Sequence, residues 1–147
     1  MKKKLNKFKN SLILFYTGIN RQADKILINI KKSGKKFKNF DKLSNLAKQF
    51  EKELIFGNIE NCGEILNENW QLKKNLDNSV SSLNLDQIYS AAKNAGAIGG
   101  KILGARGGGY FLFITKQKNK EKLIKTLNKL QYINFKFTSE GSKIIKI

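Results

Sequence analysis

Apolar residues follow two spacings along this chain, one typical of strands and one typical of helices. Residues 12–16 read Leu-Ile-Leu-Phe-Tyr and residues 110–114 read Tyr-Phe-Leu-Phe-Ile, each with a glycine nearby. Continuous apolar runs of this length predict buried strands. Apolar and polar residues alternate over residues 133–137, which predicts a strand with one buried face. Short strands are also expected at residues 102–103, before a glycine cluster, and at 143–147.

Apolar residues at steps of three and four predict the helices. This spacing places helices at residues 21–30, 41–56, 59–70, 85–95 and 119–130. Asp41 is expected to cap the second of these, and Gly57 and Gly96 are expected to end the second and fourth. Residues 31–39 contain five lysines and are expected to form a solvated loop.

The order of these elements predicts the fold class. Strands joined by helices and a glycine-linked strand pair favour an α+β fold, a mainly antiparallel sheet with helices packed on one face. A chain of 147 residues suits one domain with its own core. We assign residues 11–147 to this domain and residues 1–10 to a basic, poorly ordered lead.

Charge is the most unusual feature of the composition. The formal net charge is +18, from 29 basic and 11 acidic residues, which suits nucleic acid or an anionic membrane surface. However, Arg21 and Arg106 are the only arginines, and the lysines are scattered along the chain. Both facts disfavour a nucleic-acid reader, because such proteins use arginine for paired contacts. A basic module that binds nucleic acid or a sugar phosphate without catalysis is the alternative function.

The sequence also bears on the compartment. No apolar stretch is long enough to cross a bilayer, and the basic first residues are not followed by the apolar stretch of a signal peptide. Cys62 is the one cysteine, which excludes an internal disulfide and fits a reducing environment. We therefore expect a cytoplasmic protein without a membrane partner.

Several kinds of chemistry are excluded. With no histidine and one cysteine, the chain cannot form a Ser–His pair, a Cys–His pair or a soft metal site, so we predict no catalytic residue and no metal ligand. The glycine-rich stretch lacks the Gly-Lys-Ser/Thr ending of a Walker loop, and a strand follows it where a dinucleotide fingerprint needs a helix. Glycines 107–109 suit a tight turn or a backbone that phosphate can approach, and the residues alone leave both open.

Three segments, in order, carry a family resemblance. Residues 95–113 read Ala-Gly-Ala-Ile-Gly-Gly-Lys-Ile-Leu-Gly-Ala-Arg-Gly-Gly-Gly-Tyr-Phe-Leu-Phe and resemble the third motif of the GHMP small-molecule kinases. Residues 14–23 (Leu-Phe-Tyr-Thr-Gly-Ile-Asn-Arg-Gln-Ala) and 67–74 (Asn-Glu-Asn-Trp-Gln-Leu-Lys-Lys) resemble segments of the branch that phosphorylates heptose phosphate and related sugars. The resemblance covers about residues 11–147 and implies the C-terminal domain of such a kinase, with a ferredoxin-like fold.

The resemblance implies an ATP-dependent sugar or sugar-phosphate kinase that uses magnesium. In that family the N-terminal half supplies a serine- and glycine-rich phosphate loop, a magnesium ligand and a catalytic Asp, and no such loop occurs in this sequence. Phosphoryl transfer depends on positioning and charge neutralisation. We therefore expect little or no activity without a partner chain that carries the nucleotide-binding half. The uncovered cleft surface predicts such a partner or self-association.

The resemblance also implies site residues. Those expected beside the transferred phosphate are Gly104, Ala105, Arg106, Gly107, Gly108 and Gly109. Those expected near the sugar-phosphate substrate are Thr17, Gly18, Arg21, Trp70 and Lys73. Arg106 stands where the family has glycine, so it strains the loop if φ is positive there and can reach a phosphate if φ is negative. Trp70 also fits a core aromatic, and Thr17 and Gly18 also fit a plain strand end.

Overall fold

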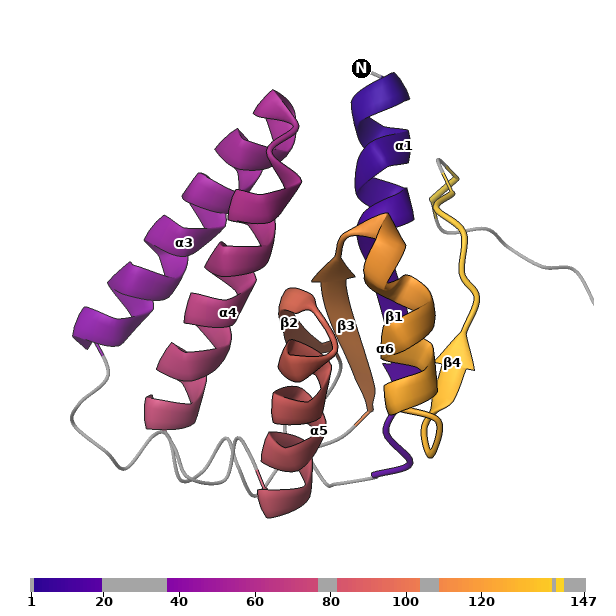
Figure 1. Cartoon of the computed structure of the whole chain (residues 1–147). Coiled ribbons are helices and arrows are strands. Elements are labelled where there is room, and N and C mark those ends of the chain that lie inside the picture. Colours follow the sequence, from indigo (N-terminus) through magenta and orange to yellow (C-terminus); the bar gives the residue numbers. More distant parts are fainter. Residues whose placement is uncertain (1, 20–36, 77–81, 104–108, 139, 142–147) are drawn as a thin grey trace, which may run out of the picture.

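The computed structural model describes residues 2–19, 37–76, 82–103, 109–138 and 140–141. The helix predicted at residues 21–30 and the strand predicted at 143–147 lie outside these residues. The elements, in chain order and as labelled in Figure 1, are α1 (Lys2–Ser11), β1 (Leu12–Tyr16), α3 (Phe37–Phe56), α4 (Ile59–Leu76), α5 (Leu83–Asn94), β2 (Ala97–Leu103), β3 (Tyr110–Thr115), the 3-10 turn η2 (Gln117–Asn119), α6 (Lys120–Thr126) and β4 (Gln131–Ile133).

The described strands form one antiparallel sheet in the order β2-β3-β1-β4. Phe111 of β3 lies opposite Phe15 of β1, and Tyr110 at the start of β3 lies opposite Leu103 at the end of β2. β4 pairs with the other edge of β1, where Tyr132 lies opposite Phe15. The predicted α+β class and the antiparallel sheet are therefore confirmed. The glycine cluster connects two paired neighbouring strands, β2 and β3.

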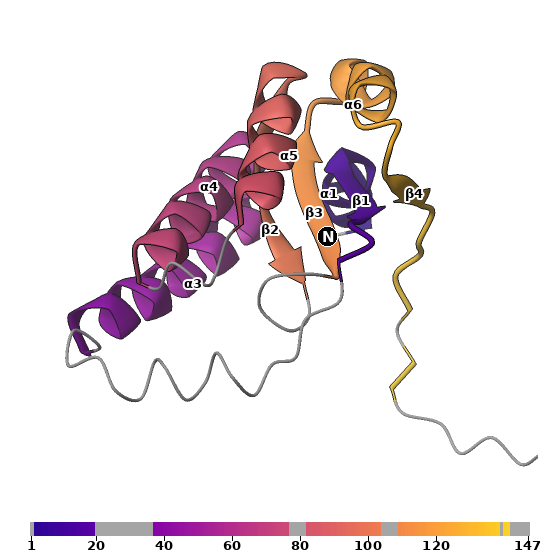
Figure 2. The same ribbon diagram turned by 90° about the horizontal axis from the view of Figure 1, so that it is seen from below.

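One face of the sheet packs against α5 and α6, which lie side by side over it (Figures 1 and 2). Phe15, Phe111 and Phe113 of the strands are fully buried on this face. They share a cluster with Leu85 of α5 and Leu123 of α6, both also fully buried. Burial of each such side chain stabilises the fold by about 2 kcal/mol.

The opposite face of the sheet also packs against helices, α1 and the pair α3 and α4, so the prediction of helices on one face only is wrong. Leu12 of β1 and Ile114 of β3 belong to this second cluster, together with Phe8, Ile59 and Cys62 of the helices. Successive residues of a strand point to opposite faces, so a strand buried on both faces is apolar at every position. This explains why the two central strands are continuous apolar runs.

Helix α4 crosses β2 at a point where glycines meet. A Cβ atom added at Gly99 would lie 1.9 Å from the carbonyl oxygen of Gly63, and one added at Gly63 would lie 2.5 Å from the Ile98 side chain. No side chain larger than hydrogen fits between the two backbones. This close crossing allows α4 to join both clusters, its first half on one face of the sheet and Trp70 on the other.

The first residues differ from the prediction of a poorly ordered lead, because residues 2–11 form α1. Phe8, only 8% exposed, anchors the helix against Phe50 of α3, with ring centroids 6.1 Å apart. Lys4 Nζ donates a hydrogen bond to the carbonyl oxygen of Ile55, at 2.9 Å. The burial of Phe8 therefore keeps α1 packed on the domain, although the lysines of this segment had suggested disorder.

The helix pair differs from the prediction at its start and agrees at its turn. α3 begins at Phe37, so Asp41 does not cap it, and residues 37–39 are helical where a loop was expected. Gly57 ends α3 with a φ of +81°, and the N–H groups of Gly57 and Asn58 both donate to the carbonyl oxygen of Glu53. This left-handed glycine end is the one expected from the sequence.

The last elements differ from the prediction, because α6 is shorter and β4 shares only Ile133 with the strand predicted at residues 133–137. α6 ends at Thr126, although Leu127 beyond it is still buried, and β4 ends at Ile133. β4 pairs with Leu14, Phe15 and Tyr16, so its ladder stops two residues short of the start of β1 at Leu12. The chain beyond then packs on α1, where Phe137 stacks on Phe8 with ring centroids 6.5 Å apart.

Candidate functional site

The glycine-rich connection is anchored where the end of β1 meets the start of β3. The backbone N–H and the Oγ1 hydroxyl of Thr17 both donate to the carbonyl oxygen of Gly109, at 2.8 and 2.9 Å. The N–H of Gly109 donates in return to the carbonyl oxygen of Ile19, at 3.0 Å. Thr17 is only 8% exposed, so these bonds are shielded from water. We call this set of contacts the Thr17–Gly109 junction.

Both glycines at the junction have backbone angles that favour glycine. Gly18 has a φ of +69° and Gly109 a φ of +99°. A Cβ at Gly109 would also lie 2.8 Å from the carbonyl oxygen of Leu103, whereas a Cβ at Gly18 would meet no atom of the described residues within 4 Å. Gly109 is therefore required by the turn itself. Gly18 has no atom of the described residues close to the position of a Cβ, so its glycine is explained by its φ angle and not by packing.

The structure brings together only part of the predicted site. Thr17 and Gly109 are joined by hydrogen bonds at one end of the sheet, and Gly18 follows Thr17 directly there. The other predicted loop residues and one predicted substrate contact lie outside the described residues: Gly104, Ala105, Arg106, Gly107, Gly108 and Arg21. The carbonyl oxygen of Ile19 accepts a hydrogen bond from the Gly109 N–H. Ile19 was not among the predicted site residues, and the spacing of apolar residues in the sequence does not indicate this role.

Trp70 lies in the core and does not present a ring face to a ligand. It is 2% exposed, stacks on Tyr89 with ring centroids 5.5 Å apart, and meets the edge of Phe111 at the same distance. This burial favours the core interpretation of Trp70. Its indole Nε1 is buried and has no hydrogen-bond partner among the described residues.

Two lysines close the last turn of α4, where positive charge is favourable. Lys74 pairs with Asp86 of α5, with Nζ and Oδ1 2.6 Å apart. Lys73 follows Trp70 by one turn of the same helix and is half-buried. Lys73, the lysine predicted to contact the substrate, therefore lies on a helix that packs in the core.

The buried ionisable groups are poor acids and poor bases at neutral pH. Burial raises the pKa of the Tyr89 hydroxyl to about 12, and this hydroxyl donates to Asn67 Oδ1 at 2.8 Å. Burial likewise raises the pKa of the Cys62 thiol to about 11. Neither group can serve as a general base, because the ideal pKa for that task lies near the working pH.

The described residues do not fit a magnesium ion. Within the described ranges, no three acidic, histidine or cysteine side chains gather as a metal site. Magnesium prefers carboxylate and phosphate oxygens in an octahedral arrangement. The described residues therefore form no protein cage for a metal, and a magnesium ion here would rest mainly on phosphate oxygens and water. Separately, no helix in the described parts of the chain has the length and apolar character of a membrane span.

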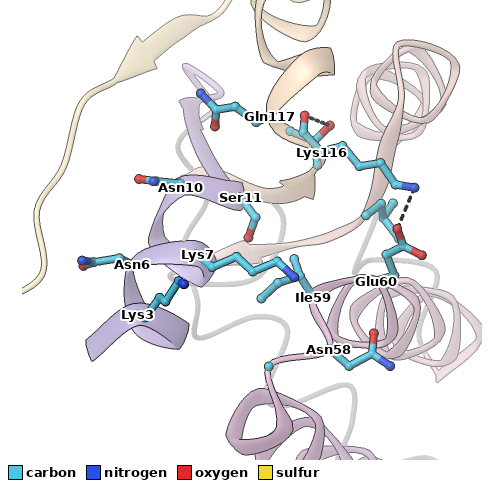
Figure 3. Close-up of a pocket in the computed structure, with 13 residues that line it drawn as sticks. Lys3, Asn6, Lys7, Asn10, Ser11, Asn58, Ile59, Glu60, Lys116 and Gln117 are labelled. Atoms are coloured by element: carbon cyan, nitrogen blue, oxygen red, sulfur yellow. Dashed lines mark hydrogen bonds and ion pairs between the residues drawn. The ribbon is translucent and has the colours of Figure 1, made fainter. Parts of the chain in front are cut away.

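A pocket of about 590 Å³ lies at the other end of the sheet (Figure 3). It is bounded by α1, by the first turn of α4 and by the end of β3, with Lys3, Lys7, Glu60 and Lys116 among its charged residues. The sequence interpretation missed it because α1 was not expected to be a helix. The four-residue spacing of Lys3 and Lys7 was the available signal.

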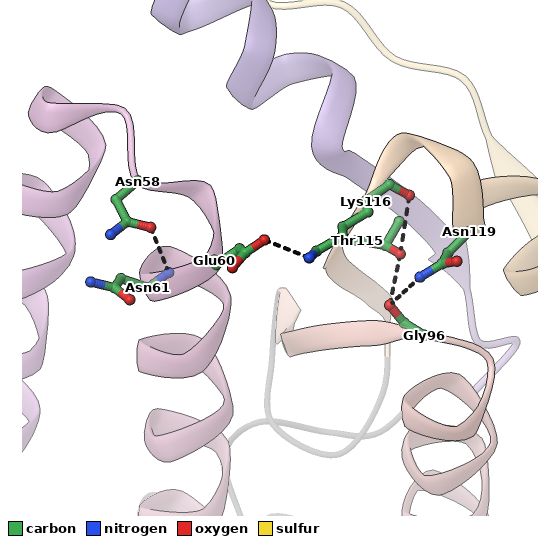
Figure 4. A network of polar contacts seen from close by, with 7 residues as sticks. All are labelled: Asn58, Glu60, Asn61, Gly96, Thr115, Lys116 and Asn119. Carbon is green, nitrogen blue, oxygen red and sulfur yellow. Dashed lines mark hydrogen bonds and ion pairs between the residues drawn. The ribbon is translucent and has the colours of Figure 1, made fainter.

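A polar network fixes the rim of this pocket (Figure 4). Lys116 Nζ and Glu60 Oε1 are 2.6 Å apart, and the pairing with Lys116 lowers the pKa of the Glu60 carboxyl from its ordinary value. Thr115 Oγ1 donates to the carbonyl oxygen of Gly96 at 2.9 Å, and Asn119 Nδ2 donates to the same oxygen at 3.4 Å. These contacts join the end of β3 to α4 and to the turn before β2.

Comparison with known proteins agrees with the resemblance seen in the sequence. The family model "GHMP kinases C terminal" matches residues 40–133. The D-glycero-alpha-D-manno-heptose 7-phosphate kinase of Campylobacter jejuni subsp. jejuni is 34% identical over 140 residues, which are 92% of this chain and 41% of that protein. The chain thus spans about two fifths of the length of this relative.

Solved structures show the same fold. The L. major mevalonate kinase in complex with R-mevalonate aligns with a TM-score of 0.69 and 24% identity, over 80% of this chain and 37% of that one. The Methanococcus jannaschii mevalonate kinase aligns with a TM-score of 0.65 and 22% identity, over 86% of this chain and 41% of that one. The family model matches more than half of this chain, so the chain belongs to the C-terminal domain family of the GHMP kinases.

Proposed function

We propose that this chain is the substrate-side half of an ATP-dependent sugar-phosphate kinase, with a heptose phosphate as the substrate class. The observation that carries the proposal is the Thr17–Gly109 junction, which holds the glycine loop at the ends of the central strands. The relative of 34% identity, a heptose 7-phosphate kinase, supports the substrate class. The lone buried Cys62 supports a cytoplasmic site of action.

In this proposal the junction positions the loop and does not itself bind phosphate. The carbonyl of Gly109 accepts two hydrogen bonds from Thr17, and the N–H of Gly109 is used by Ile19. The donors for a phosphate would therefore be the N–H groups of residues 104–108, in the manner of other glycine-rich phosphate loops. Arg21 and Lys73 would neutralise the phosphate of the sugar.

The proposal treats this chain as incomplete for catalysis. ATP supplies the transferred phosphoryl group, and magnesium neutralises its charge. The described residues offer no ligand set for the metal. The chain would therefore orient the sugar phosphate, exclude water from the loop and depend on a nucleotide-binding half, carried by a partner chain or by further sequence.

A chimera tests the proposal. Residues 1–147, with α1 included, would replace the matching C-terminal part of the Campylobacter jejuni kinase, and ADP release would be measured with ATP, magnesium and heptose 7-phosphate. We expect activity from the chimera and none from either half alone. Thr17→Val should lower activity by about tenfold, because the loop loses its side-chain anchor. Thr126→Val is the control, because it removes a hydroxyl-to-carbonyl hydrogen bond of similar length at an exposed position of α6, far from the glycine loop in the sequence.

The outcome that contradicts the proposal is a folded chimera without activity on heptose 7-phosphate. Folding would be checked by circular dichroism, so that a failure to fold is not read as a failure of function. Activity that survives Thr17→Val at the control level would remove the role given to the Thr17–Gly109 junction.

A further inference from the structure

The pocket beneath α1 lies at the opposite end of the sheet from the glycine loop. Ser11, which precedes β1, and Thr115, which ends β3, both line it, whereas the Thr17–Gly109 junction lies at the other end of these strands. Its volume of about 590 Å³ is within the range of small-molecule sites. The proposed kinase site does not use this cavity, so it needs a separate explanation.

The charged groups of the pocket leave an excess of positive charge. Glu60 is paired with Lys116 at 2.6 Å, so these two charges compensate each other. Lys3 and Lys7 form no ion pair within the part of the chain that the structure describes. Figure 3 shows the Lys7 side chain extending from α1 toward Ile59 and the first turn of α4. The local potential therefore favours an anion with more than one charge.

The floor of the pocket is apolar. Ile59 at the start of α4 is 8% exposed, and Ile98 of β2 is half-buried beside it. Uncharged polar groups, among them Asn58 and Gln117, surround this floor. An apolar floor with a few charged groups at the rim is the common design of a small-molecule site. A ligand that fits both parts has an anionic head and a compact apolar body.

We propose that this pocket binds a small organic phosphate monoester, with Lys3 and Lys7 on the phosphate and Ile59 and Ile98 against the body. A phosphate monoester carries close to two negative charges at neutral pH, which matches the two positive charges by which the pocket exceeds its Glu60–Lys116 pair. Lysine is an effective phosphate ligand as a point charge. The site is independent of the proposed kinase activity, because none of its residues belongs to the glycine loop or to the Thr17–Gly109 junction.

The test uses phenyl phosphate as the probe, titrated into the full chain and followed by calorimetry and by amide chemical shifts. We expect saturable binding, with shifts at residues 58–61 and 116–117. The double variant Lys3→Gln/Lys7→Gln should weaken binding by at least about tenfold. The matched control is Lys42→Gln/Lys48→Gln, which removes the same charge from exposed positions of α3 and should change affinity less than about twofold.

Each contrary outcome overturns the proposal. Equal weakening in both double variants would mean that only net charge attracts the probe. Shifts centred on Thr17 and Gly109 would place the phosphate at the glycine loop, and the pocket would then have no ligand. Inorganic phosphate that binds as tightly as phenyl phosphate would exclude a role for the apolar floor. Lys3 and Lys7 are exposed, so their variants should fold, and circular dichroism would confirm this.

Discussion

At the scale of single residues, backbone meets backbone where Gly99 of β2 faces Gly63 of α4. The Cβ of an alanine at position 99 would lie 1.9 Å from the Gly63 carbonyl oxygen. This obstacle is main chain and cannot turn aside as a side chain can. Gly99 is therefore required by the packing of α4, whatever its place in the glycine-rich motif.

We predict that Gly99→Ala destabilises the protein by about 3 kcal/mol, because α4 must move away from the sheet. Urea unfolding followed by circular dichroism measures this change. Gly141→Ala is the control, since a Cβ there meets nothing within 4 Å, and it should change the free energy of unfolding by less than about 0.5 kcal/mol. An unchanged midpoint for Gly99→Ala would show that α4 does not lie this close to β2.

The residues of the candidate site were only partly predictable from the sequence. Thr17 and Gly109 are 92 residues apart, and no apolar spacing links positions at that distance. The family resemblance alone indicated that they belong to one site. The structure adds the reason, a pair of hydrogen bonds to one carbonyl oxygen. The burial of Trp70 could not be deduced, because a tryptophan on a helix suits both a core and a ligand surface.

At the scale of elements, α1 joins the fold through one aromatic residue. Phe8 contacts the rings of Phe50 and Phe137, at 6.1 and 6.5 Å between centroids, while Leu5 on the same helix is 51% exposed. Helix propensity cannot hold a ten-residue lysine-rich helix in water without packing. The stability of α1 therefore comes from tertiary contacts, of which the burial of Phe8 is the largest and the hydrogen bond from Lys4 to Ile55 is another.

We predict that Phe8→Ala costs about 3 kcal/mol of stability and lowers the helix content, because a buried ring is replaced by a cavity. Leu5→Ala should cost less than about 1 kcal/mol, since half of that side chain is already in water. Thermal unfolding monitored at 222 nm compares the two variants. Equal losses would mean that α1 is held by its exposed face and not by Phe8.

Strands and helices with a clear apolar run or stripe were predicted well, whereas β2, which contains glycines, was not. The apolar runs at β1 and β3 and the stripe of α4 agree with the structure. β2 was expected only at residues 102–103, because Gly99 and Gly100 are poor strand formers. They are tolerated because α4 and the Phe113 ring occupy the space where their side chains would lie. That reason is tertiary and cannot be found in local sequence.

At the scale of the whole molecule, a single sheet separates two apolar clusters, and helices pack against the sheet in each of them. Cys62 lies fully buried in the second cluster, with 0% exposure. Burial raises the pKa of its thiol from an ordinary value of 9.0 to about 11, and the charge of Glu53 adds to the effect. The thiol is therefore a reporter of the opening of the whole second cluster.

The same pKa predicts how stability depends on pH. Between pH 9 and 11, an unfolded thiol has lost its proton while the folded thiol keeps it, so the unfolded state binds fewer protons and stability falls as the pH rises. Guanidinium unfolding at several pH values from neutral to 10.5 should show a steeper loss for the native protein than for Cys62→Ala, which lacks the thiol. Parallel curves for the two proteins would mean that Cys62 ionises as freely in the folded state as in the unfolded state, and that this second cluster is open to water.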